Sequence, residues 1–321
     1  MSAWEEWSSV GVEYGEVFTK LQQLHINGCK RLCCVDWSDS LPCLTQLEIK
    51  GKYGIEVVLE LSLPRTPALR ELKLGVCENP RLEELPQTLE SIHIGVNNGL
   101  ESLIEAINKG QTFFLKEVHI QKCCSAVTLL PECLPTTLTE LEIKNCEKLE
   151  FPMQCSLKLS SIRRVTVMDS CDSLRFFPLD FFPNLIDLSI TNCENLESLG
   201  VSSNGDGDGD GMLTSLSSIY ICGCPNFVSF PEGRLHAPNL VVLEVYRCKK
   251  LKKLPEQMRN LHPSLHTLKI SDCPELELFP EGGLPPNLII PWAWNCPKLI
   301  AQQMQWYLRD RRRVFCTISK S

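Results

Sequence analysis

Apolar residues recur along the chain in one short pattern that returns roughly every 24 residues. Its clearest form is L-x-x-L-x-I-x-x-C-x-x-L, as in the segment from Leu21 to Leu32. In the middle of this segment Leu24 and Ile26 alternate with three polar residues. A period of two places alternate side chains on opposite faces of an extended strand. Each copy therefore predicts a short strand with one apolar face.

Twelve copies align when Val or Ile replaces some of the leucines, and a cysteine marks most of them. Eighteen cysteines scattered at random over 321 residues would place fewer than one in the twelve ninth positions, yet nine of the twelve hold one. The other three copies carry Lys52, Asn97 and Ser170 there. The copies begin at residues 21, 44, 69, 89, 115, 138, 162, 185, 216, 240, 265 and 288, and the cysteines are Cys29, Cys77, Cys123, Cys146, Cys193, Cys224, Cys248, Cys273 and Cys296.

A repeat of this length with this leucine pattern is typical of leucine-rich-repeat proteins. A strand with one apolar face cannot stand alone, so successive copies stack their strands in parallel, about 4.8 Å apart, around a common core. We therefore predict an α/β-type leucine-rich-repeat solenoid, or horseshoe, with parallel strands on its concave face. The ninth residue of each copy (the turn cysteine) should lie inside, where the chain bends away from the strand.

The segments that return from one strand to the next carry a Leu-Pro or Phe-Pro pair in many copies, such as Leu85-Pro86 and Phe177-Pro178. Proline disfavours a helix at the residue before it. We therefore predict extended or 3₁₀ segments on the convex face, with little helix except near the C-terminus, where residues 299–313 suit one.

These patterns divide the chain into three parts. Residues 1–20 predict a partial leading repeat, 21–299 about twelve repeats, and 300–321 a C-terminal helix with a further partial repeat. Because neither end shows a capping unit, we expect the chain to begin and end inside a longer array. The Gly- and Asp-rich segment 201–211 predicts a flexible acidic loop; calcium binding is its alternative, although no closing Glu follows.

Composition excludes several classes of partner. The net charge of −7 argues against nucleic acid and anionic membranes. No apolar stretch approaches the roughly 20 residues that span a bilayer, and the chain carries neither a signal peptide nor an N-glycosylation sequon. We therefore expect reduced cysteines and a cytoplasmic location, with the nucleus as the alternative.

The outward strand positions are the candidate partner-binding surface on the concave face. In the fifth and sixth copies they supply acidic residues that would steer a partner, and in the ninth, tenth and twelfth they supply aromatic and apolar anchors. Ordinary surface aromatics are the alternative. A register slip would instead turn the two tryptophans inward. The candidates are Glu117, Glu140, Glu142, Tyr220, Val242, Tyr246, Trp292 and Trp294.

The candidates for chemistry are few. His93 and His119 occupy the same outward position in neighbouring copies, which allows a metal or pH-sensing role; solvated surface residues are the alternative. The turn cysteines lack the paired C-x₂-C spacing of a zinc site and are interpreted as buried packing residues. No nucleophile, base and orienting group come together in the repeat, so we expect no enzyme, no metal and no cofactor in this chain.

Four features of the sequence carry a resemblance to a known family: the repeat with its turn cysteines, the Leu/Phe-Pro pairs, the opening segment Trp4-Glu-Glu-Trp7 and the segment from Cys296 to Trp306. The sequence resembles the leucine-rich-repeat region of plant disease-resistance proteins that also contain a coiled coil and a nucleotide-binding domain. The resemblance covers essentially the whole chain. It implies an intracellular immune receptor segment that senses pathogen effectors and restrains the receptor until one arrives.

The implied partner is a pathogen effector, a guarded host protein or the receptor's own nucleotide-binding domain. No G-x-x-x-x-G-K-[ST] loop occurs in the chain, so the ADP or ATP of the family is expected only in a domain upstream. A substrate adaptor of the F-box type is the first alternative, although its longer repeats and F-box are not seen. A receptor ectodomain is the second, disfavoured by the missing signal peptide, spanning helix and sequons.

Overall fold

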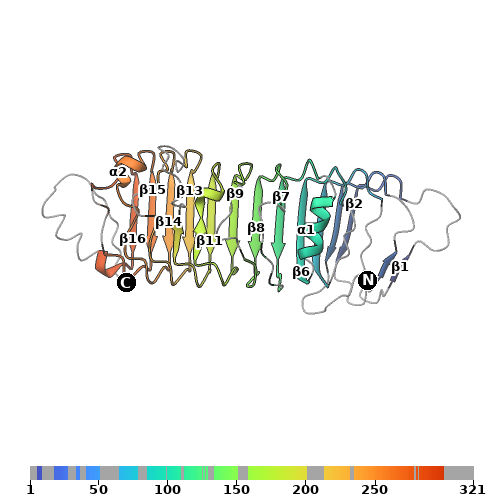
Figure 1. Ribbon diagram of the computed structural model, residues 1–321, viewed down its shortest axis with the longest axis horizontal. Coiled ribbons are helices and arrows are strands. Elements are labelled where there is room, and N and C mark those ends of the chain that lie inside the picture. Colours follow the sequence, from blue (N-terminus) through green and yellow to red (C-terminus); the bar gives the residue numbers. More distant parts are fainter. Residues whose placement is uncertain are drawn as a thin grey trace. The chain divides into compact units, whose positions relative to one another are not determined.

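The computed structural model describes residues 6–8, 18–27, 34–36, 41–50, 65–78, 85–98, 100–109, 112–124, 126, 128, 134–150, 158–200, 213–231, 235–277, 280 and 282–299. The chain forms two compact units, Met1–Pro152 and Met153–Ser321. Each unit is a coil in which every turn contributes one strand to a parallel sheet (Figure 1).

The N-terminal unit contains six of these strands, which pair in chain order. A separate short pair, β1 (Glu6–Ser8) and β3 (Cys34–Asp36), is also parallel. The six strands are β2 (Gln23–Asn27), β4 (Gln46–Lys50), β5 (Glu71–Glu78), β6 (Ser91–Asn98), β7 (Glu117–Gln121) and β8 (Glu140–Lys144).

The C-terminal unit contains the other six, again parallel and in chain order, without register shifts. All twelve strands that the repeat predicted are therefore confirmed, and so is the parallel solenoid. The six are β9 (Arg164–Met168), β11 (Asp187–Thr191), β13 (Ser218–Cys222), β14 (Val242–Tyr246), β15 (Thr267–Ser271) and β16 (Ile290–Trp294).

Most strands have the one-sided burial that their sequence predicts; in β7 the third residue, His119, is buried as well. In β11 the second and fourth residues, Leu188 and Ile190, are buried, whereas the first, third and fifth are partly exposed. The same pattern holds in β8, β9, β13 and β14. Burying one large aliphatic side chain contributes about 1.5–3 kcal/mol. The stacked pairs of apolar residues are therefore the main stabilising component of both units.

The turns that follow the sheet strands from β7 to β16 have a common construction, whereas β5 and β6 continue as strand through Cys77 and Asn97. The residue before the turn cysteine has left-handed backbone, as in Asn145 (φ 53°), Asn192 (φ 53°) and Gly223 (φ 66°). The backbone N–H of Gly223 then donates to the carbonyl of Tyr246, the last residue of the next strand, at 2.8 Å. This ties each turn to its neighbour and satisfies a backbone donor where the strand ends.

The turn cysteines point into the core, as predicted. Their Sγ atoms lie 3.2–3.7 Å from the carbonyl oxygen two residues earlier, which a thiol can reach as a weak donor. The predicted turn positions 29 and 52 and the side chains of Cys77 and Asn97 lie outside the described residues. The cysteines with this contact, all buried, are Cys146, Cys193, Cys224, Cys248, Cys273 and Cys296.

The seventh copy departs from the template by one residue. Ser170 is buried at the expected position, and its Oγ donates to the carbonyl of Met168 at 2.5 Å. The following Cys171 is also buried, has a φ of 59°, and its carbonyl accepts the backbone N–H of Leu174. In regular copies the turn cysteine itself makes that bond, as Cys193 does with Leu196. The turn therefore contains one extra residue and shares its roles between Ser170 and Cys171.

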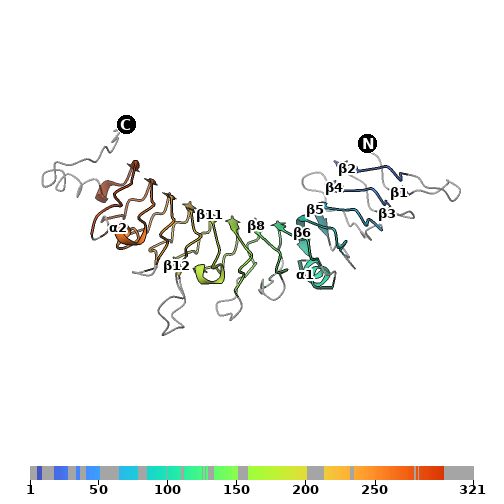
Figure 2. The same ribbon diagram turned by 90° about the horizontal axis from the view of Figure 1, so that it is seen from above.

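The described returning segments of the C-terminal unit include extended and 3₁₀ structure, as predicted. β10 (Phe176–Pro178) pairs with β12 (Ser198–Gly200), and η2 (Leu179–Phe181) is a 3₁₀ turn. Phe177 and Phe182 are fully buried, with ring centroids 5.6 Å apart. In the C-terminal unit these segments lie on the side of the coil opposite the strands of the large sheet (Figure 2). The aromatic residues therefore fill the core from that side.

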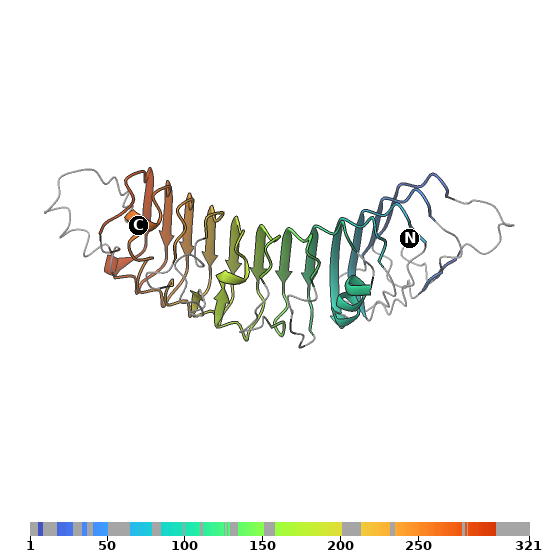
Figure 3. The same cartoon turned by 45° about the horizontal axis from the view of Figure 1, so that its top comes forward.

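Helix α1 (Leu100–Lys109), in the fourth copy, is the ten-residue exception, and the short α2 (Met258–Leu261) is a second. Leu103, Ala106 and Ile107 bury one face of α1, which lies on the return side of its unit (Figure 3). Residues 297–299 are helical, so of the predicted C-terminal helix 299–313 only the first residue is described; the remainder lies outside the described residues, as does loop 201–211.

A candidate binding surface on the strands

In the C-terminal unit, the parallel register aligns the partly exposed side chains in rows that cross the strands. We call this side of the sheet the outer strand face. Tyr220, Glu244 and Lys269 occupy the third position of successive strands and so form one row. Tyr246 and Trp294 lie in the fifth-position row, separated by Ser271. Predicted anchors from three copies therefore lie on one face.

Tyr220 and Tyr246 contact one another diagonally across β13 and β14. Their ring centroids are 5.7 Å apart and the rings are inclined at 51°. The hydroxyl of Tyr246 donates to Glu244 Oε2 at 3.0 Å, and Lys269 Nζ donates to Glu244 Oε1 at 2.8 Å. The four side chains, which we call the tyrosine cluster, thus position one another.

The electrostatics of the tyrosine cluster keep both phenols neutral. Burial, followed by the hydrogen bond to Glu244, raises the pKa of Tyr246 above its usual value. Burial also raises the pKa of Tyr220, with a further contribution from Cys222. The ion pair between Lys269 and Glu244 balances the remaining charge. The cluster therefore offers aromatic area whose polar ends are mostly satisfied within the chain.

The remaining aromatic and apolar candidates lie on the same strands. Val242 is partly exposed at the first position of β14. The backbone of Trp292 pairs with Lys269, and Trp294 pairs with Ser271, so β16 is in register with β15. Ala293 is buried opposite Ile270. The register slip that would have turned the tryptophans inward is therefore absent from this strand pair, and Trp294 is partly exposed.

The acidic candidates of the N-terminal unit are on the outer face of β7 and β8. Glu117 and Glu140 pair in register as neighbours. Glu142 accepts hydrogen bonds from Lys144 and His119. Burial alone would raise the pKa of Glu142, but the bonds from Lys144 and His119 outweigh it and lower the pKa. Glu142 is therefore charge-compensated within the chain, unlike a free steering charge.

Comparison with known proteins identifies plant disease resistance proteins as relatives of this chain. A disease resistance protein of Arabidopsis thaliana is 38% identical over 239 residues, which are 74% of this chain and 16% of that protein. The disease resistance RPP13-like protein 1 of the same plant is 27% identical over 293 residues, or 90% of this chain and 22% of that protein. The chain is a leucine-rich-repeat solenoid homologous to plant disease resistance proteins.

The chain spans only about a fifth of the length of these resistance proteins. No protein-family model matches it. Among solved structures, the functional domain of InlJ from Listeria monocytogenes, described as including a cysteine ladder, is 15% identical with a TM-score of 0.42, covering 87% of this chain and 64% of that one. The circular leucine-rich-repeat protein CroV588 has 15% identity, a TM-score of 0.34 and coverages of 86% and 48%. The fold assignment rests on the repeat and its register instead.

Two residues of the tyrosine cluster were not among the binding residues predicted from the sequence. Glu244 and Lys269 are polar residues at third strand positions, where a charged side chain normally indicates only a solvated face. The sequence feature that could have identified Glu244 and Lys269 was their alignment with Tyr220 in the predicted strand register. Within the described part of the chain, no helix combines the length and apolar character needed to cross a bilayer.

Proposed function

We propose that this chain is the protein-recognition segment of an intracellular plant immune receptor. It binds a pathogen effector, a guarded host protein or the receptor's own nucleotide-binding domain, and it restrains the receptor until the effector arrives. It acts by binding rather than by catalysis, in the cytoplasm. The homology to disease resistance proteins supports the receptor class, and the tyrosine cluster is the observation that supports recognition through the strands.

The tyrosine cluster has the physical features of a binding hot spot. Tyrosine is enriched at such sites because it supplies a large contact area with a polar end. Here the ring of Tyr220 and the hydroxyl of Tyr246 are already fixed by neighbours. A surface that is ordered before binding loses less side-chain entropy when the partner arrives. The cluster is therefore the expected energetic centre of the interface.

The charged residues of the N-terminal unit would contribute mainly to the rate of association. Glu117 and Glu140 are neighbouring like charges on the outer strand face. Charges at the edge of an interface steer the encounter but add little affinity. We therefore propose that Glu117 and Glu140 speed the association of a basic partner, and that Tyr220 and Tyr246 are the anchors of the C-terminal unit.

The test is the double variant Tyr220→Ala with Tyr246→Ala. The chain is co-expressed with the nucleotide-binding domain of the parent gene, and binding is measured by co-precipitation and titration. Loss of one buried tyrosine anchor typically costs about 2 kcal/mol, which weakens binding about thirtyfold. Autoactivation of the intact receptor should rise in parallel if this contact restrains it.

Phe113→Ala with Phe114→Ala is the matched control, because these two aromatic residues are exposed but precede β7 and do not lie on it. The control should bind as the wild type does. Tyr246→Phe keeps the ring and removes the bond to Glu244, so it should weaken binding less than Tyr246→Ala. Equal binding and equal receptor activity in the double alanine variant and the wild type would contradict the proposal.

A further inference from the structure

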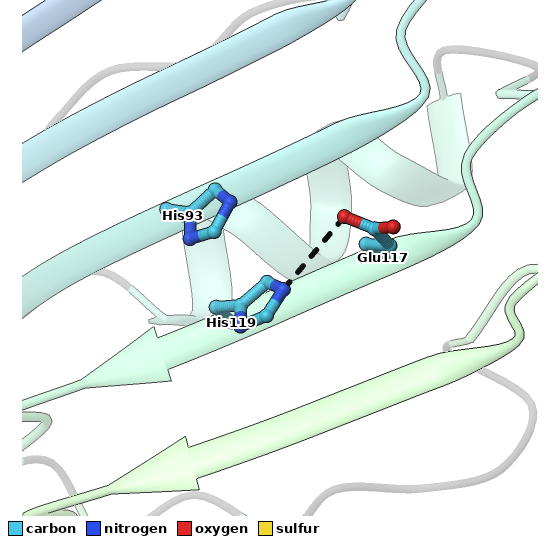
Figure 4. Close-up of side chains that lie close together, drawn as sticks. All are labelled: His93, Glu117 and His119. Carbon is cyan, nitrogen blue, oxygen red and sulfur yellow. Dashed lines mark ion pairs between the residues drawn. The ribbon is translucent and has the colours of Figure 1, made fainter. Parts of the chain in front are cut away.

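His93 and His119 face one another on neighbouring strands of the N-terminal unit. They occupy the third positions of β6 and β7 and pair directly in register. Their rings are stacked, with centroids 4.0 Å apart and planes inclined at 10° (Figure 4). His119 is almost fully buried and His93 is about one-quarter exposed. Two imidazoles are thus held side by side on a face that is otherwise open.

Glu117 provides a third donor beside them. Its Oε2 lies 4.0 Å from His119 Nε2, and one donor atom from each of His93, Glu117 and His119 lies within 4.8 Å of the others. A tetrahedral zinc ion with bonds of about 2.0–2.2 Å holds its ligand atoms roughly 3.3 Å apart. The carboxylate of Glu117 is 45% exposed and has room to move closer. The more exposed of the two rings, His93, must also turn out of the stack, because an imidazole binds a metal through a lone pair in its ring plane.

The surroundings of His119 are those of a metal-binding histidine. Its Nδ1 is hydrogen-bonded to the carboxylate of Glu142, which leaves Nε2 directed toward Glu117. Histidine ligands of metals typically donate their second nitrogen to a carboxylate, which fixes the ring and makes the ligating nitrogen more basic. Glu142 is itself held by Lys144. This second layer is independent of the three donors.

His93 presents its donor atom next to a partner that can be exchanged. Its Nε2 lies 3.1 Å from the hydroxyl of Ser91, a neutral partner that a metal ion can replace.

We propose that His93, His119 and Glu117 form a binding site for a zinc-class divalent ion, with Glu142 supporting His119. Two imidazoles and one carboxylate favour Zn²⁺ over Mg²⁺ or Ca²⁺, which prefer oxygen ligands alone. Three protein ligands leave the fourth coordination position open on the outer strand face. When the ion is bound to the isolated chain, a water molecule would complete its coordination.

The test is titration of the full chain with Co²⁺, which substitutes for Zn²⁺ and gives visible absorption. Co²⁺ distinguishes this site from the cysteines, because thiolate ligands add intense near-ultraviolet charge-transfer bands that imidazole and carboxylate lack. We expect one Co²⁺ per chain, displaced by Zn²⁺, without thiolate bands. His93→Asn with His119→Asn should abolish binding, and Glu142→Gln should weaken it about tenfold or more.

His25→Asn is the matched control. His25 occupies the same third strand position in β2 and contacts Glu48 at 2.7 Å, and no second imidazole pairs with it in register. This variant should bind Co²⁺ as the wild type does. Glu117→Gln should also weaken Co²⁺ binding. This variant changes only a partly exposed side chain, so it should remain folded, and circular dichroism checks that it does. Thiolate bands, no bound Co²⁺, or unchanged binding in the double histidine variant would overturn the proposal.

Discussion

The thiol of each turn cysteine has two roles at the end of its strand. It fills a small space inside the coil, and it lies in reach of the carbonyl two residues earlier. Ser170 shows that a hydroxyl performs both roles at the same place in the seventh copy. Recurrence of cysteine predicted the inward position correctly. The left-handed residue before it was not predicted, because residue types as different as Lys122, Asn145 and Arg247 adopt that conformation.

Replacements of Cys193 should be graded by size. Cys193→Ala and Cys193→Ser should change the free energy of unfolding little, since Ser170 already occupies an equivalent place. Cys193→Leu adds volume at a side chain that is only 1% exposed and should cost about 1–3 kcal/mol. Urea melts of the three variants measure the difference.

Cys124→Leu is the control for that series, because Cys124 is exposed. It should melt as the wild type does. Equal stability of Cys193→Leu and Cys193→Ala would mean that the turn has room for a larger side chain, and the tight inward position would be wrong.

At the scale of elements, the strands were predictable and helix α1 was not. The strands follow from alternation and from the repeat length, which fix both their position and their register. The repeat template assigned every returning segment to extended or 3₁₀ structure, so α1 was missed. Its signal was present: no proline occurs between Pro86 and Pro131, and Leu100, Leu103 and Ile107 have helical spacing.

Leu103→Ala should therefore destabilise the N-terminal unit. Leu103 is 1% exposed in the middle of α1, and removing a buried leucine side chain costs about 2–5 kcal/mol. Urea denaturation followed by circular dichroism measures the loss. Glu105→Ala, on the exposed face of the same helix, removes only the 3.2 Å ion pair with Lys109 and should cost about 0.5 kcal/mol or less. Similar midpoints for the two variants would show that α1 does not pack on the core.

At the scale of the whole molecule, the repeat predicted which candidate residues share a face but not how they contact. Register alone placed Tyr220 near Tyr246 and His93 beside His119, and both pairs are in contact. The bonds that fix them, from Glu244 and Glu142, depend on side-chain rotamers, which periodicity does not specify. The sequence therefore predicts which residues lie on the outer strand face, but their hydrogen bonds depend on side-chain rotamers that only the structure gives.

The turn cysteines lie in successive turns of the coil, so the packing of neighbouring turns determines how reactive their thiols are. Burial raises the pKa of Cys146 to about 11, and a hydrogen bond with Cys248 together with burial raises that of Cys273 to about 12. Only the thiolate reacts at an appreciable rate, so the thiols of Cys146 and Cys273 are inert at neutral pH even before access is considered. A hydrogen bond with Cys224 lowers the pKa of Cys193, which is protected by its burial instead. The buried set is Cys123, Cys146, Cys171, Cys193, Cys224, Cys248, Cys273 and Cys296.

A charged thiol reagent should accordingly react quickly with Cys43 and Cys124, which are exposed, and slowly with the eight buried thiols. After denaturation all eighteen cysteines should react, because we expect them to be reduced. The time course of modification, with mass spectrometry to locate each site, measures this. Because the buried thiols of one unit lie in successive turns of the coil, their protection should be lost together as that unit unfolds. Fast modification of the buried thiols in the folded chain would contradict the stacked turns, and a shortfall after denaturation would reveal disulfides instead.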